Sequence, residues 1–177
     1  MEQYMPTAQW WLITLRLLHI LAGVFWTGGA FMLARFVVPT FVSNAAGLML
    51  LRDLTQRRRV PVVINVAALV SIVSGTLLFW TMGHTAGEVW EGSPTGLTLS
   101  VGGALALLAA IVGNVVTRPA GKRLARYGEL LSTNDGSSLG EHADTVRHLH
   151  KRMQRGMNAT ATLLVLAAAC MAVARYI

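Results

Sequence analysis

His19 is the residue whose type and position point most directly to chemistry, because it is a histidine inside a long apolar segment. Ionisable groups at membrane depth are rare and are functional candidates by default. Gly23 and Trp26 follow at i+4 and i+7, which places all three residues on one helix face. A neutral imidazole is a good ligand for haem iron or copper, and a neighbouring glycine leaves room for a flat group. We therefore expect His19, Gly23 and Trp26 to bind haem b or copper. The alternative is a histidine that hydrogen-bonds to a neighbouring helix.

Two further residues could complete such a site. Arg16 precedes His19 by three positions and could hold a carboxylate, such as a haem propionate. Its alternative role is to extend its guanidinium to the membrane surface. His84 follows the second apolar segment and is the predicted second metal ligand beside His19. The alternative for His84 is a histidine at the membrane surface.

Several other kinds of chemistry are excluded. Cys170 is the single cysteine, so the chain has no internal disulfide and no cysteine-ligated zinc or iron–sulfur site. No nucleotide-binding or hydrolase motif occurs. The apolar segments contain no Asp, Glu or Lys, which argues against an ion-coupled pump. The sequence does not decide whether the protein is an enzyme.

Membrane-spanning helices must position these residues. Hydrophobic residues make up 54% of the 177 residues, and charged residues 13%, where a soluble domain has about 25% charged residues. A bilayer core needs about 20 mostly apolar residues per helix. Four stretches meet this requirement: residues 10–38, 61–82, 98–117 and 157–174. The prediction is an all-α, polytopic membrane protein, a single domain that forms an up-down bundle of four transmembrane helices.

The basic residues predict the orientation of the bundle. Thirteen of the 15 Lys and Arg residues lie in or beside the first and third connections, which places these connections in the cytoplasm and both termini outside. Counting back from Arg35 places His19 about 5 Å inside the outer boundary. The net charge of +7 then serves topology and contact with an anionic cytoplasmic leaflet, and no nucleic-acid partner is expected.

The third connection, residues 118–156, is the long cytoplasmic loop. Leu124, Tyr127 and Leu131 at i, i+3 and i+7 predict that the third helix continues into it, and residues 132–140 predict a flexible turn. Residues 141–155 are expected to be a polar lead-in to the fourth helix or a solvated charged face.

Small and amide side chains predict how the helices pack. Close packing and polar contacts hold helices together in lipid, so small residues should face the bundle interior. These include Gly75, Gly102, Ala168 and Ala172. Asn65, Asn114 and Asn158 should also turn inward and hydrogen-bond. The first and third helices each end near an arginine and a proline, which indicates a two-fold repeat of helical hairpins, with chance as the alternative.

Residues 17–30, LLHILAGVFWTGGA, resemble the first helix of the CopD-like membrane proteins, whose pattern is roughly L-H-x3-A/G-x2-W-x-G-G. Pro39, Arg57–Arg59 and Ser74-Gly75 continue the resemblance, which covers about residues 10–80. HemJ-like protoporphyrinogen oxidases share a similar histidine and tryptophan. The resemblance implies a multi-pass protein of the cell inner membrane that handles copper or haem through His19. The chain departs from these families in lacking a methionine-rich outer segment and a lysine within a span.

Three functions remain open at this point. The first is a haem b or copper protein for electron transfer, with quinone as a partner, or for copper handling. The second is a non-enzymatic accessory or assembly subunit of a larger membrane complex. The third is a haem-dependent porphyrinogen oxidase, against which the absent lysine counts.

Overall fold

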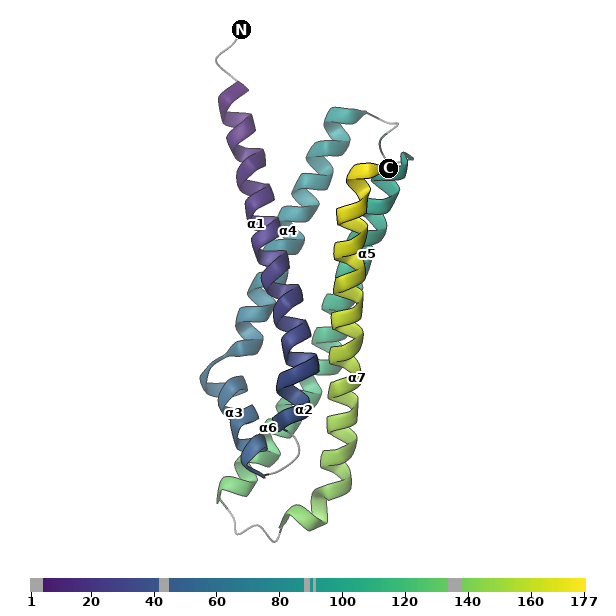
Figure 1. Cartoon of the computed structure of the whole chain (residues 1–177). Helices are drawn as coiled ribbons and strands as arrows, with labels where there is room; N and C mark the ends of the chain where they lie inside the picture. Colours follow the sequence, from purple (N-terminus) through teal and green to yellow (C-terminus); the bar gives the residue numbers. More distant parts are fainter. Residues whose placement is uncertain (1–4, 42–44, 88–89, 91, 134–137) are drawn as a thin grey trace.

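The described part of the protein is helical and contains no strand (Figure 1). A computed structural model describes residues 5–41, 45–87, 90, 92–133 and 138–177. Four helices are long and apolar enough to cross a membrane: Gln9–Thr40, Val60–Thr85, Pro94–Tyr127 and Ala143–Tyr176. The all-α, four-helix prediction is confirmed, and the protein is a multi-pass membrane protein.

The long helices are built from shorter elements. The first consists of α1 (Met5–Met32), the π-helical turn η1 (Leu33–Val37) and α2 (Val38–Phe41). The short helix α3 (Ala45–Arg52) and the π-helical turn η2 (Asp53–Arg57) lead to α4 (Val60–Ala86). The third consists of α5 (Pro94–Val112), the π-helical turn η3 (Gly113–Thr117) and α6 (Arg118–Thr133), and the fourth of α7 (Ser138–Val173), which ends in a 3-10 turn, η4 (Ala174–Tyr176).

The predicted continuation of the third helix into the connection at residues 118–156 is confirmed, and the predicted turn at residues 132–140 lies partly outside the described residues. Residues 118–133 continue the third helix, and α7 already begins at Ser138. Leu124, Leu149 and Met153 are buried where α6 packs against α7. This apolar seam stabilises a helical hairpin that extends the bundle beyond the predicted spans.

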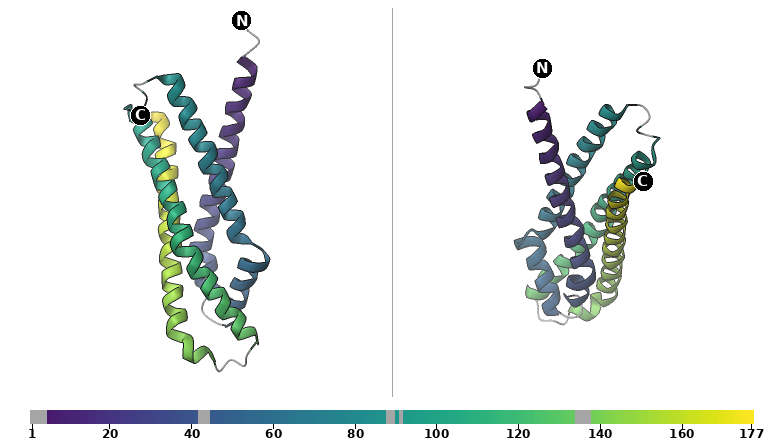
Figure 2. Two further views of the ribbon diagram at one scale, coloured as in Figure 1. Left: turned by 180° about the vertical axis from the view of Figure 1, so that it is seen from behind. Right: turned by 45° about the horizontal axis from the view of Figure 1, so that its top comes forward.

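The helices are arranged as two pairs, α1 with α4 and α5 with α7 (Figure 1). Both termini lie at one end of the molecule, which we call the terminal end; the opposite end, with α3 and α6, is the basic end. Helices α1 and α4 cross near their middles and diverge toward the terminal end, whereas α5 and α7 stay side by side (Figure 2).

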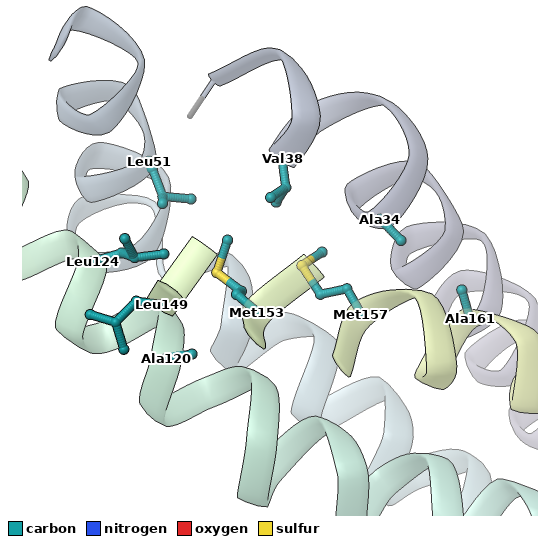
Figure 3. Close-up of a cluster of buried hydrophobic side chains, with 9 residues drawn as sticks. All are labelled: Ala34, Val38, Leu51, Ala120, Leu124, Leu149, Met153, Met157 and Ala161. Carbon is teal, nitrogen blue, oxygen red and sulfur yellow. The ribbon is translucent and has the colours of Figure 1, made fainter. Parts of the chain in front are cut away.

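Two buried clusters join the pairs. The lower cluster lies at the basic end, where α6 and α7 meet the end of the first helix and α3 (Figure 3); it contains Ala34, Val38, Leu51, Ala120, Leu124, Leu149, Met153, Met157 and Ala161. The upper cluster contains Trp26, Ala30, Ala68, Ala109 and Leu164. Three alanines surround Trp26, so the indole fills the space that the small side chains leave.

A π-helical turn precedes a proline in both the first and the third long helix. In η1 the Val38 N–H bonds to the Leu33 carbonyl, and Pro39 has no N–H, so the backbone offers no donor to the Ala34 carbonyl. Gln154 on α7 supplies that donor, with its Nε2 2.6 Å from the Ala34 oxygen. A neighbouring helix thereby satisfies a group that proline leaves unpaired, as membrane helices require.

The same turn recurs in the third helix. In η3 the Arg118 N–H bonds to the Gly113 carbonyl, and Pro119 follows. Each π-helical turn thus begins six residues before its proline. This shared backbone feature supports the two-fold repeat that the sequence indicates.

The prediction that small residues of the fourth helix face the bundle interior is wrong for two alanines. Ala168 and Ala172 are exposed, and α7 instead buries Ala161, Leu164 and Ala167. A run rich in alanine offers small residues on every face, so it does not fix the rotation of the helix.

The asparagines do not form one inward-facing group. Asn158 accepts a hydrogen bond from Gln154 Nε2 at 3.2 Å. Asn114 is exposed, because its amide bonds locally to the Ala110 carbonyl at 3.0 Å and gains nothing by turning inward. Asn65 is half-buried.

Candidate cofactor site at His19

Small residues allow α1 and α4 to meet closely at His19. A Cβ atom added to Gly75 would lie 2.6 Å from His19 Cε1 and 2.8 Å from Nδ1, so the imidazole rests directly on the α4 backbone. One turn further along α1, a Cβ at Gly23 would lie 3.2 Å from Ser71 Oγ. The crossing therefore depends on glycines from both helices.

A hydrogen bond fixes which nitrogen of the His19 imidazole carries a proton. His19 Nδ1 lies 2.8 Å from the Ser71 carbonyl oxygen. Since a carbonyl only accepts hydrogen bonds, Nδ1 is the donor and carries the proton. In the neutral ring, Nε2 then presents a lone pair. Metal-binding histidines use this arrangement, in which one ring nitrogen donates to the protein and the other binds the metal.

The Nε2 atom of His19 is unpaired and not fully enclosed in the described part of the chain. The described part of the chain places no hydrogen-bond partner at Nε2, and this nitrogen is not among the fully buried polar atoms without a partner. The side chain as a whole is half-buried. The ring is therefore held at one nitrogen and accessible at the other.

Buried serines line the α4 side of the ring. Ser71 and Ser74 are 6% and 3% exposed. Ser74 Oγ donates to the Val70 carbonyl at 2.6 Å and lies 3.2 Å from the Ser71 carbonyl oxygen. Because the Ser74 hydroxyl bonds to its own helix, it brings polarity to the crossing without being an unpaired buried group.

The ring lies beside the middle of the α4 span. Ser71 is 11 residues from Val60, and Gly75 is 10 residues from Thr85, so both ends of this span are about 15 Å away. The count along the first helix instead predicts a position about 5 Å inside the outer boundary.

Gly23 and Trp26 have other surroundings than those expected for a cofactor site. The space beside Gly23 is occupied by Ser71, so it does not hold a flat group. Trp26 is only 4% exposed and belongs to the upper cluster. Both residues therefore contribute to helix packing. The sequence prediction used only the helix face that they share with His19 and did not consider that α4 packs against this face.

Arg16 and His84 are both exposed, the first on the same helix as His19 and the second on α4. Arg16 is exposed about one turn from His19 toward the terminal end. His84 is exposed near the end of α4, with its ring 4.8 Å from that of Trp80 in an edge-to-face contact. Nine residues separate His84 from Gly75, which corresponds to about 13 Å along the helix. The structure does not bring His84 and His19 together around one metal ion.

Sequence reasoning missed the hydrogen-bond acceptor of His19. Ser71 and Gly75 stand four residues apart in α4, and a hydroxyl or small residue at this spacing marks a close helix contact. This signal identifies the contact face of α4 but not the residue that meets it. Among the residues described, no group of three or more His, Cys, Asp or Glu side chains could hold a metal ion.

Comparisons with known proteins add no further assignment: no protein-family model, curated protein or solved structure matches the chain. The functional argument therefore depends on the geometry of the site.

Proposed function

We propose that this membrane protein binds haem b or a copper ion through Nε2 of His19, for electron transfer or copper handling. The observation that carries the proposal is the 2.8 Å contact between His19 Nδ1 and the Ser71 carbonyl oxygen. It keeps a proton on Nδ1, so that the neutral ring would bind a metal through Nε2. A histidine with only a packing role would not need its second nitrogen accessible.

The available donors favour haem over copper. A single histidine can provide the proximal ligand of a haem iron. Copper sites usually combine several imidazole, thiolate or thioether ligands. In the described part of the chain His84 lies about 13 Å along α4 from the crossing. A haem would supply one-electron transfer, with a membrane quinone as the expected redox partner, and Ser71 and Gly75 would orient its histidine ligand.

The test is the absorption spectrum and metal content of the purified protein from cells supplied with haem and copper. We expect a Soret band or one equivalent of copper, lost in His19→Ala and retained in His84→Ala. The His84 variant is the matched control, because it removes an exposed imidazole from the same two-helix pair. A colourless and metal-free wild-type protein, or equal loss in both variants, would refute the proposal.

A second candidate is an accessory subunit of a larger membrane complex. Small residues on the outside of the bundle favour it: a Cβ at Gly28 or Gly103 would meet no atom within 4 Å, and Ala168 and Ala172 are exposed. Outward-facing small residues are the surfaces on which membrane helices associate. Cross-linking in native membranes followed by mass spectrometry tests this candidate. Ala168→Leu/Ala172→Leu should abolish a partner cross-link, and a wild-type protein that gives none would exclude it.

A further inference from the structure

An open groove lies between α6 and α7 at the basic end, outside the His19 site. Its volume is about 760 Å³, and its lining includes Arg123, Arg126 and Tyr127 from α6 and Asp144 and His148 from α7. Pockets for small molecules usually measure about 300–1,000 Å³. The groove is therefore large enough for a ligand of metabolite size.

The walls of the groove are fixed by the lower cluster. Leu149 lines the groove and is itself 6% exposed, and Leu124 beneath α6 is fully buried. Both belong to the apolar seam between the two helices. Since this seam sets the spacing of α6 and α7, the polar side chains above it project from rigid helices and not from a loop.

The groove carries two arginine side chains for which the described residues provide no ion pair. Arg123 and Arg126 are both exposed and lie about one turn apart on α6. Within the described ranges, no carboxylate forms an ion pair with either guanidinium, and Asp144 on the opposite wall forms none. Two sets of guanidinium donors therefore remain available to an anion, and His148 adds a ring N–H.

We propose that this groove binds a phosphate group, carried either by an anionic lipid headgroup or by a small soluble phosphate. Guanidinium groups match phosphate oxygens through paired hydrogen bonds, and two of them on one wall can reach one phosphate from two sides. Arg123 lies five residues beyond Arg118, or about 7.5 Å along the helix. The groove thus opens just past the residues that end the third apolar stretch, within reach of headgroups and of solvent.

The binding test uses the full-length protein in nanodiscs of phosphatidylcholine. Isothermal titration with inorganic phosphate measures the soluble source, and native mass spectrometry of nanodiscs containing phosphatidic acid measures the lipid source. The groove variant is Arg123→Gln/Arg126→Gln. The control is Arg147→Gln/Arg152→Gln, which removes the same charge from exposed positions of α7 outside the groove.

We expect the groove variant to bind at least about tenfold more weakly in one of the two arms, because it loses charge-assisted hydrogen bonds, which are roughly twice as strong as neutral ones. The control should bind within about twofold of wild type. Arg126→Lys keeps the charge but loses the paired donors, so we expect its affinity to lie between those of the wild type and the double variant. This single variant tests the proposal if the double variant fails to fold. Equal losses in the groove and control variants, or no binding in either arm, would overturn the proposal.

Discussion

Replacing Gly75 by alanine tests the contact between α4 and the His19 imidazole. The added Cβ would lie 2.6 Å from His19 Cε1 and 2.8 Å from Nδ1, well inside ordinary contact distance. The ring must shift, and the 2.8 Å hydrogen bond to the Ser71 carbonyl must lengthen or break. Overpacking of this kind costs about 1–3 kcal/mol, and loss of the hydrogen bond lies within the same range.

Gly28→Ala is the matched control for this substitution. Gly28 also lies inside a long helix, but a Cβ there would meet no atom within 4 Å. Both variants gain about 0.8–1 kcal/mol from the higher helix propensity of alanine, so this gain cancels in the comparison. The difference between the two free energies of unfolding therefore isolates the clash, and we expect Gly75→Ala to be less stable than Gly28→Ala by about 1–3 kcal/mol.

Reversible unfolding in mixed micelles, followed by circular dichroism, measures both variants. A double-mutant cycle that combines Gly75→Ala with His19→Ala measures how much of the penalty comes from the imidazole. Without the imidazole the new methyl group has room, so the penalty at Gly75 should fall by about 0.5–3 kcal/mol in the His19→Ala background. Equal stability of the two glycine variants, or an unchanged Gly75 penalty without the imidazole, would show that the ring does not lie on α4.

Two other predictions concern the basic half of the bundle and use the same unfolding assay. Gln154→Leu should lose about 1–3 kcal/mol of stability, because it leaves the Ala34 carbonyl without a donor. Pro39→Ala should recover part of that loss by restoring a backbone N–H, and a Gln154→Leu variant as stable as wild type would contradict the role given to Gln154. Gly156→Ala should lose about 1–3 kcal/mol, because its Cβ would lie 2.6 Å from Thr117 Oγ1. Thr117→Ala should relieve this loss. Gly103→Ala, which meets open space, is the control that gains helix propensity without a clash, and equal effects of the two glycine substitutions would disprove the close contact between α7 and η3.

The helical architecture could be predicted from the sequence because the bilayer restricts it strongly. Only segments of about 20 apolar residues can cross a bilayer as helices, and the chain contains four. The extension of the third helix into α6 was predictable from the helical spacing of Leu124 and Tyr127. The early start of α7 was harder to predict. The charged residues from Glu141 to Arg155 resemble a solvated face, although Leu149 and Met153, four residues apart, pack with Leu124 of α6 in the seam that orders them.

The candidate site was predictable only in part. His19 stands out because a histidine in an apolar segment is conspicuous, but its acceptor is a backbone carbonyl, and carbonyl groups are identical along the chain. The rotation of α1 relative to α4 determines which carbonyl it meets, and that rotation depends on contacts far apart in the sequence. Trp26 shows the same difficulty, since the alanines that enclose it come from two other helices, α4 and α5, as well as its own.

The position of His19 at the crossing has a mechanical consequence. Helices α1 and α4 separate on the terminal side of this point and converge with the other pair on the basic side (Figure 2). The imidazole therefore lies close to the crossing point of α1 and α4. A change in their crossing angle produces little translation at this point but rotates the ring relative to the Ser71 carbonyl. Helix tilt, whether set by bilayer thickness or by a neighbouring protein, would in this way be transmitted to the imidazole.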